Sequence, residues 1–192
     1  SMKFLNTMKI FFSTLFISLL LFSCFQKTEK NSRYSEEIAE LKRTFISVDS
    51  NYKEFQKLHL DSLSSLKRIV DAKYEKIKTI HQADKVDNNY DVIMLTARGQ
   101  FTKKIPLVVK KKKEIEAEFE LSAKNYDALS KNLITENLDE NKSMLYYYEE
   151  KNALMLLNAE ILNFIEETNN TLTLSTVIVP QMDSIIKVYD NQ

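Results

Sequence analysis

The chain has 192 residues, a formal net charge of zero and 28% charged side chains, but only one glycine, two prolines and one cysteine. With Gly99 as the only glycine, a dinucleotide-binding fingerprint, a P-loop and a nucleophile elbow are each excluded. A single cysteine excludes internal disulfides and cysteine-based zinc sites, and the balanced charge argues against a nucleic-acid partner. Glycine is avoided in helices and needed in hairpins, so its scarcity favours an all-helical chain.

The N-terminus has the layout of a bacterial export signal. Ser1 is interpreted as a scar left by tag removal. Lys3 and Lys9 are the only charged residues before a short apolar run, Ile10–Phe22. A helix needs about 20 apolar residues to cross a bilayer, so this run fits the core of a secretory signal better than a membrane span.

The sequence Leu21-Phe22-Ser23-Cys24 resembles the lipobox of bacterial lipoproteins, in which a leucine, a variable residue and a small residue precede a cysteine. The resemblance covers residues 1–24 only. It implies that residues 1–23 are a signal peptide and that Cys24, once linked to a diacylglycerol, becomes the new N-terminus. More than one acyl chain gives stable membrane anchoring. An ordinary signal peptide with an incidental cysteine and an uncleaved membrane anchor are the alternatives.

Residues 24–33 are polar and predict a short, flexible, lipidated tether. Removal of residues 1–23 takes away two lysines and no acids, so 25 basic and 27 acidic side chains remain and the net charge becomes −2. No aspartate and no acidic run follow Cys24. By the resemblance to lipoproteins, this favours the outer membrane, facing the periplasm.

A first long helix is predicted from Tyr34 to Ala83. Its apolar residues begin with steps of 4 and 3, the 3.5-residue period of a coiled-coil seam, by which we mean the line of residues that packs against a neighbouring helix. These residues are Tyr34, Ile38, Leu41, Phe45, Val48, Tyr52 and Phe55. The seam continues at a period near 3.67 through His59, Leu63, Leu66, Val70, Tyr74 and Ile77. The polar segment Asp84–Asn89 predicts a turn.

A second helix is predicted from Tyr90 to Leu133. Its seam contains Tyr90, Met94, Ala97, Phe101, Ile105, Val108, Ile115, Phe119, Ser122, Tyr126, Leu129 and Leu133. Pro106 removes a backbone hydrogen bond and clashes one turn back, at a cost of about 3 kcal/mol. We therefore expect a kink or a short break near Lys104–Pro106, in a neighbourhood that Gly99 also loosens.

After a turn at Thr135–Lys142, a third helix is predicted from Ser143 to Thr168. Its apolar positions are Met144, Tyr147, Leu154, Leu157, Ile161 and Ile165. Asn169–Thr171 interrupts the pattern, and Pro180 opens or kinks a last helix. The segment Thr-Leu-Thr-Leu-Ser-Thr-Val-Ile-Val at 171–179 has an alternating, β-branched character, so over residues 169–180 a strand, an irregular stretch and a continuing helix all remain open.

Short polar turns make successive helices antiparallel. The predicted fold is all-α, with one domain over residues 34–192. Its architecture is an elongated antiparallel bundle of three long helices with coiled-coil-like seams, or of four helices if the last break is sharp.

Two groups of side chains are candidates for binding a partner. The first contains six lysines around Pro106, namely Lys103, Lys104, Lys110, Lys111, Lys112 and Lys113. They suit an anionic lipid, glycan or protein, but pairing with glutamates one turn later is the stronger interpretation, and at least one lysine must snorkel beside the seam. The second group is Tyr146, Tyr147 and Tyr148. These cover about 200° of a helix, so one is expected in the core and at least one in solvent.

No catalytic order of residues, no Glu-x-x-His and no shared site for His59 and His81 occurs in the sequence, so we expect no enzyme, metal or cofactor. The leading hypothesis is a membrane-anchored lipoprotein whose helical rod binds or scaffolds an envelope protein, or associates with itself. One alternative is a lipoprotein that binds a small ligand or a cell-wall glycan in a tyrosine-lined cleft near Gly99 and Pro106. The other is a surface-exposed lipoprotein of the adhesin type.

Overall fold

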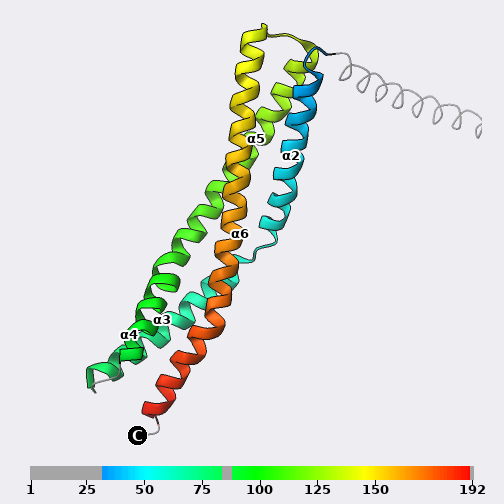
Figure 1. Cartoon of the computed structure of the whole chain (residues 1–192). Coiled ribbons are helices and arrows are strands. Elements are labelled where there is room, and N and C mark those ends of the chain that lie inside the picture. Colours follow the sequence, from blue (N-terminus) through cyan, green and yellow to red (C-terminus); the bar gives the residue numbers. More distant parts are fainter. Residues whose placement is uncertain (1–31, 84–87, 191–192) are drawn as a thin grey trace, which may run out of the picture. The chain divides into compact units, whose positions relative to one another are not determined.

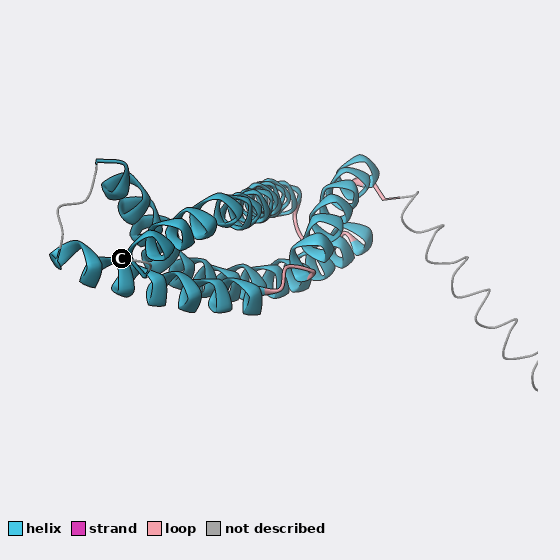
Figure 2. Cartoon of the chain, turned by 90° about the horizontal axis from the view of Figure 1, so that it is seen from below, coloured by secondary structure: helices cyan, strands magenta, loops and turns pink. Residues whose placement is uncertain are grey.

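The computed structural model describes residues 32–83 and 88–190, which are helical apart from short turns and contain no strand (Figures 1 and 2). The prediction of an all-α fold is therefore confirmed. The predicted signal peptide, Cys24, the tether up to residue 31, and residues 84–87 of the predicted turn Asp84–Asn89 lie outside the described residues. Among the described helices, none combines the length and the apolarity that a membrane span requires.

Six helical elements follow one another within the described residues. They are α2 (Ser35–Gln56), α3 (Leu60–Ala83), α4 (Asn88–Thr96), the π-helix η1 (Ala97–Lys103), α5 (Lys104–Thr135) and α6 (Glu140–Asp190). The described residues divide into two compact units. Unit 1 contains residues 32–46 and 122–154, and unit 2 contains residues 47–83, 88–121 and 155–190. Parts of α2, α5 and α6 belong to each unit.

The predicted seam of the first helix is buried in α2. Tyr34, Ile38, Leu41, Val48, Tyr52 and Phe55 are each at most 8% exposed. In unit 1 the half-buried ring of Phe45 stacks on Tyr126 of α5, with the ring centroids 4.2 Å apart. In unit 2 the ring of Tyr52 stacks on Phe119 of α5 at 3.7 Å. The 3.5-residue period therefore identified the packed face of α2 correctly.

The prediction of one continuous helix from Tyr34 to Ala83 is wrong at Lys57–His59, where α2 ends and α3 has not yet begun. The amides of Lys57 and Leu58 each donate to the carbonyl three residues back, at 3.1 Å, which tightens the end of α2 into a 3₁₀ turn. The Leu58 carbonyl, released from the helix, accepts a hydrogen bond from Lys112 Nζ at 3.1 Å.

The break coincides with the change of seam period in the sequence. His59, which the sequence places in the seam, is exposed, whereas Phe55 before it and Leu63 after it are fully buried. Two helices separated by a turn can each direct their own apolar face inward, so they need not share one continuous seam.

The helical pattern also changes before Pro106, where the sequence predicts a kink or a short break. From Ala97 to Lys103 the chain is a π-helix, in which amides bond carbonyls five residues back, and α5 begins immediately afterwards. Pro106 has no amide hydrogen for the carbonyl of Thr102, so this turn lacks one hydrogen bond of the regular α-helical pattern. Gly99 lies in the π-helix with no heavy atom within 4 Å of the position that a Cβ would take.

Helix α6 is continuous over 51 residues. The predicted interruption at Asn169–Thr171 and the separate last helix at Pro180 are therefore wrong. Of the possibilities left open for residues 169–180, the continuing helix is the one formed. Hydroxyl groups here bond carbonyls one turn back: Thr171 to Glu167 at 2.9 Å, Ser175 to Leu172 at 2.6 Å, and Thr176 to Thr173 at 2.8 Å. These bonds let hydroxyl residues occupy a helix interior.

The turn between α5 and α6 contains Glu136–Asp139, inside the predicted range Thr135–Lys142. Glu136 has a φ of 52°, the left-handed conformation that commonly ends a helix. Asp139 caps α6, because its Oδ1 accepts the amide of Lys142 at 3.0 Å. That hydrogen bond, helped by the nearby Lys142 ammonium group, lowers the pKa of Asp139.

Candidate functional site

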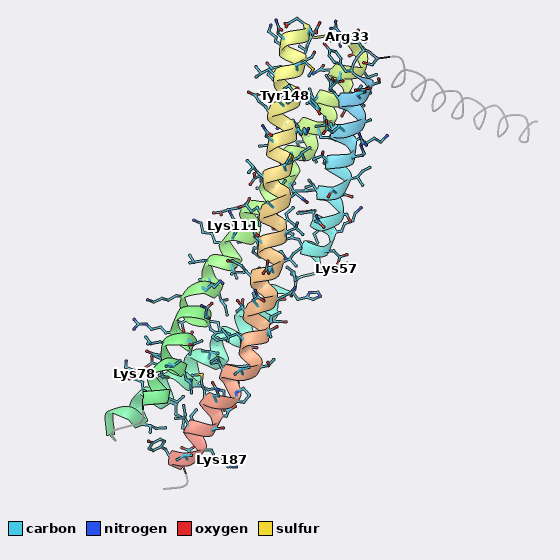
Figure 3. All side chains as sticks on the ribbon, viewed as in Figure 1. Arg33, Lys57, Lys78, Lys111, Tyr148 and Lys187 are labelled. Atoms are coloured by element: carbon cyan, nitrogen blue, oxygen red, sulfur yellow. The ribbon has the colours of Figure 1, made fainter. Side chains whose placement is uncertain are left out.

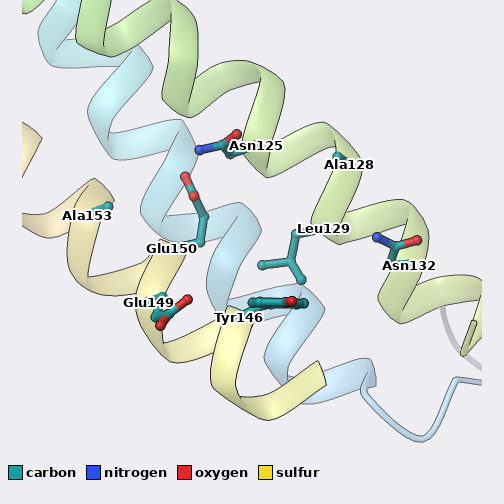
Figure 4. Close-up of a pocket in the computed structure, with 8 residues that line it drawn as sticks. All are labelled: Asn125, Ala128, Leu129, Asn132, Tyr146, Glu149, Glu150 and Ala153. Atoms are coloured by element: carbon teal, nitrogen blue, oxygen red, sulfur yellow. The ribbon is translucent and has the colours of Figure 1, made fainter. Parts of the chain in front are cut away.

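In unit 1, α5 and α6 border a cavity of about 400 Å³ (Figure 4). Asn125, Ala128, Leu129 and Asn132 line it from α5, and Tyr146, Glu149, Glu150 and Ala153 line it from α6. The lining carries two carboxyl groups and two amides but no lysine or arginine among the described residues. Such a lining can offer hydrogen bonds and negative charge to a small polar ligand.

Glu150 is the most deeply placed ionisable group of this cavity. The residue is 8% exposed, and its Oε1 has no hydrogen-bond partner among the described residues. Burial raises the pKa of the Glu150 carboxyl, and a hydrogen bond from the Asn125 side chain opposes that rise. In Figure 4 the Glu150 carboxyl points from α6 toward Asn125.

The sequence analysis missed Glu150, although the sequence contained a signal. The buried face of α6 passes through Ser143, Tyr147, Glu150, Leu154 and Leu157, in steps of 4 and 3. Apolar residues alone leave a gap between Tyr147 and Leu154, which either Glu150 or Lys151, both charged, can fill at this spacing. A charged residue at a seam position is therefore the recognisable mark of this site.

The three adjacent tyrosines point in different directions, as predicted. Tyr147 is 3% exposed, whereas Tyr146 is 44% and Tyr148 is 54% exposed. The Tyr147 hydroxyl donates to the Glu40 carboxylate of α2, which also accepts a hydrogen bond from Lys151 Nζ at 2.6 Å. Tyr146 lines the cavity and Tyr148 projects from α6 (Figure 3), so the triplet does not form one binding surface.

The buried tyrosines make stability sensitive to alkaline pH. Burial raises the pKa of Tyr52, Tyr90 and Tyr147 above the ordinary value of 10.0, and for Tyr147 the bond to the Glu40 carboxylate adds to the effect. Above that pH the unfolded chain loses protons that the folded chain keeps. We therefore expect the free energy of unfolding to fall as pH rises through 10, in urea titrations followed by circular dichroism.

The same titrations test which tyrosines carry the alkaline effect. Tyr147→Phe should make the fall shallower, and Tyr146→Phe at the exposed neighbour is the matched control. If tyrosinate absorbance grew fully at pH 10 while the free energy of unfolding stayed constant, this account would be wrong.

The six candidate lysines, all in unit 2, are mostly engaged within the chain. Lys110 pairs with Glu114 at 3.5 Å, Lys111 with Glu160, and Lys104 with Glu167 at 3.9 Å. Figure 3 labels Lys111 on α5. Lys103 and Lys113 are exposed and form no ion pair with the described residues. Pairing along and between helices thus accounts for much of this basic run.

Lys112 is the lysine that snorkels beside the seam. Its Nζ lies 5.6 Å from the centroid of the buried Phe55 ring and donates to the Leu58 carbonyl at 3.1 Å. Its ammonium group is also 4.0 Å from Glu116, one turn later. The side chain therefore stabilises the end of α2 and is not free for a partner.

A second cavity, of about 450 Å³, lies beside η1 in unit 2. Asp71, Tyr74, Glu75, Lys78, Arg98 and Thr102 line it. Thr102 donates to the Asp71 carboxylate at 2.6 Å, and Lys67 pairs with the same group. Burial opposes ionisation of Asp71, but these hydrogen bonds outweigh it and lower the pKa of Asp71. The cavity is near Gly99, where a cleft was expected, and contains one tyrosine.

Comparison of the chain with protein-family models, with curated proteins and with solved structures finds no match. Within the part of the chain that the structure describes, no group of three histidine, cysteine, aspartate or glutamate side chains could hold a metal ion. The function must therefore be argued from the surfaces and cavities themselves.

Helix α6 exposes a second apolar line of residues, which we call the α6 stripe. Leu145 and Tyr148 belong to it in unit 1, and Met155, Ala159 and Leu162 in unit 2. Together with the exposed Asn152, these residues follow one another along the sequence at intervals of 3, 4, 3, 4 and 3 residues. At 100° per residue, the stripe lies on the opposite side of the helix from the buried seam. Leu145, Tyr148, Met155 and Leu162 are 53%, 54%, 55% and 46% exposed.

Proposed function

We propose that this protein is a bacterial lipoprotein, anchored through Cys24 in the outer membrane and facing the periplasm, that binds another envelope protein through the α6 stripe. The observation that supports this proposal is the exposure of large apolar side chains at coiled-coil spacing. Such a line suits an amphipathic helix of a partner, which would cover it as the core covers the other side of α6.

Ser32 and Arg33, the first described residues, would connect the proposed tether to unit 1. Ser32 Oγ donates to the Leu133 carbonyl at 2.8 Å, and the Arg33 amide donates to Glu136 Oε1 at 2.9 Å. The Arg33 guanidinium also lies 3.5 Å from Glu136. A force applied through the tether would therefore be transmitted to unit 1 near the α5–α6 turn. The residues between Cys24 and Ser32 could span roughly 25 Å at most.

The proposed architecture is the elongated antiparallel bundle predicted from the sequence. Within unit 1 the α2–α5 contacts advance in opposite directions, since Ser32 bonds Leu133 and Phe45 stacks on Tyr126. A compact domain of this length would have a radius of gyration of about 15 Å. Small-angle scattering should give a clearly larger value, and a value near 15 Å would contradict an elongated bundle.

Photo-crosslinking in the native envelope tests the proposed partner. A photoreactive residue at Asn152 or Ala159, inside the α6 stripe, should trap one dominant envelope protein. Asp127, exposed on α5 outside the stripe, is the matched control position and should not trap it. Met155→Glu with Leu162→Glu should abolish the product. Crosslinks only between copies of this chain would contradict a partner protein and indicate self-association.

Fractionation of cells tests the anchor. Cys24→Ser should release the protein from the membrane fraction, whereas Ser23→Ala, which keeps a small residue before the cysteine, should not. Protease added to intact cells should leave the anchored protein uncut if it faces the periplasm. Retention of Cys24→Ser in the membrane fraction would remove the lipoprotein proposal, and digestion on intact cells would favour the adhesin-type alternative.

The cavity beside η1 favours a second candidate function, the binding of a small ligand or glycan. Tyr74 supplies an aromatic ring, and Arg98 and Asp71 supply charges of both signs. π-helical segments occur frequently at functional sites. Chemical-shift changes at Tyr74 and Arg98 upon addition of cell-wall fragments would support this function, and their absence across a fragment set would exclude it.

A further inference from the structure

We propose that the cavity between α5 and α6 in unit 1 is a binding site for a small organic ammonium ion, held by the carboxylates of Glu150 and Glu149. This site is distinct from the α6 stripe, so it adds a ligand to a protein whose partner-binding surface lies on the other side of the helix. The proposal does not depend on the lipid anchor or on the partner.

The charged groups of the cavity lining are the first support for an ammonium ligand. Glu149 and Glu150 both line it, and no lysine or arginine does among the described residues. Glu150 is 8% exposed with an unpartnered oxygen in the described structure, an arrangement that is costly unless a donor or cation compensates it. An ammonium group in the cavity would provide both.

Glu40, a half-exposed carboxylate of α2, shows how another carboxylate of unit 1 is satisfied. Glu40 accepts hydrogen bonds from Tyr147 and from Lys151, at 2.6 Å from the latter. Lys151 is the neighbour of Glu150 in the sequence, yet it reaches α2 on a different side of α6. Glu150 therefore has only the Asn125 amide, which is neutral, as a side-chain partner.

The other lining groups complement an ammonium ligand that carries further polar atoms. The side-chain amides of Asn125 and Asn132 offer both donors and acceptors. The Tyr146 ring offers a face for a cation–π contact or for stacking. A volume of about 400 Å³ suits a ligand the size of a sugar or a short polyamine.

The two oxygens of Glu150 can exchange positions easily. The last torsion of a glutamate is broad and roughly two-fold, so rotation of the carboxyl can present the unpartnered oxygen to a ligand. Three of the four buried polar atoms without a partner in the described residues belong to unit 1, on Tyr34, Ser143 and Glu150. Unpaired polar groups are thus concentrated in the unit that contains this cavity.

A role confined to helix register is the competing explanation for Glu150. A single polar residue in a seam can fix the alignment of packed helices without any ligand. The two explanations differ in the behaviour of the wild-type protein toward amines, because a register role needs no binding.

Calorimetric titration of the purified full-length protein decides between them. The probes are ethanolamine, glucosamine and putrescine, each matched to its neutral hydroxyl counterpart: ethylene glycol, glucose and butane-1,4-diol. At least one amine should bind at least tenfold more tightly than its counterpart. If no amine binds better than its counterpart, the proposal is overturned and the register role remains.

Three variants locate the bound amine. Glu150→Gln should weaken its binding at least tenfold, and Glu166→Gln, an exposed position of α6 in unit 2, should leave it unchanged. Ala128→Trp, which fills the cavity without altering a carboxyl group, should also abolish binding, and keeps the test valid if Glu150→Gln does not fold. Unchanged amine binding in Ala128→Trp would place the site elsewhere and reject this cavity.

Discussion

Replacing Phe55 with alanine is expected to lower the free energy of unfolding by about 3–5 kcal/mol. The side chain is fully buried in unit 2, at the end of α2. Its ring meets Phe164 of α6 edge-on, with centroids 5.1 Å apart, and lies 5.4 Å from the ring of Tyr52. Truncation would leave a cavity bounded by two aromatic rings and by the Lys112 ammonium group, 5.6 Å from the ring centroid.

Thermal and urea denaturation, followed by circular dichroism, measure this loss. For a chain of this length a loss of 3–5 kcal/mol corresponds to a fall in Tm of about 10 °C. Leu156→Ala is the matched control, because Leu156 is a large apolar residue that is 72% exposed, and its truncation should change stability by less than about 0.5 kcal/mol. A loss below about 1 kcal/mol in Phe55→Ala would show that Phe55 is not packed as described.

The packed faces of α2, of α4 and η1, and of the start of α5 could be predicted because their seams are built mainly from large apolar residues. From Tyr34 to Phe55 and from Tyr90 to Val108, almost every seam position is apolar, and the structure buries it. A period of 3.5 residues, repeated over several turns, determines which side of a helix faces inward regardless of its neighbours. Sequence pattern alone therefore suffices for such segments.

The break between α2 and α3 could not be predicted from the same pattern. Phe55 and Leu63 are both buried, but the residue midway between them, His59, is exposed. The turn there depends on a contact distant in sequence, since Lys112 of α5 bonds the Leu58 carbonyl. The change of seam period marks this place in the sequence, but the tertiary contact that holds the turn has no local signature.

Helix α6 was mispredicted because its seam contains hydroxyl residues. The positions that follow Phe164 at the same spacing are Thr168, Thr171, Ser175, Ile178 and Met182, with steps of 3 and 4. Thr168 and Thr171 are 2% and 3% exposed, as deeply placed as the apolar members. A search restricted to apolar residues loses the seam at Thr168, whereas the spacing continues unbroken to Met182.

The restriction of the search to apolar residues is also the reason why the candidate site was not predicted. Glu150 occupies a seam position of α6, so a search that admits polar residues at seam spacing would have found it. The cavity beside it could not be predicted, because its shape depends on the small side chains Ala128 and Ala153 on two different helices. The candidate lysines, in contrast, were visible in the sequence, but most of them pair with glutamates of α5 and α6.

Replacing Asn170 with proline is expected to destabilise the protein by about 3 kcal/mol or more. Asn170 is exposed in the middle of α6, at the place where the sequence suggested an interruption. Its side chain contributes no packing, so the change acts on the backbone alone. Proline there removes the amide that bonds the carbonyl of Glu166, and its ring clashes with that carbonyl.

Asn170→Ala is the control that separates a helix from a loop at this position. In a continuous helix alanine should stabilise the protein by about 0.5 kcal/mol, because asparagine is the poorer helix former. In a loop neither substitution would have a large effect, since a loop has no regular hydrogen bond to lose. The two variants should therefore move the urea midpoint in opposite directions, and a near-neutral Asn170→Pro would contradict the continuity of α6.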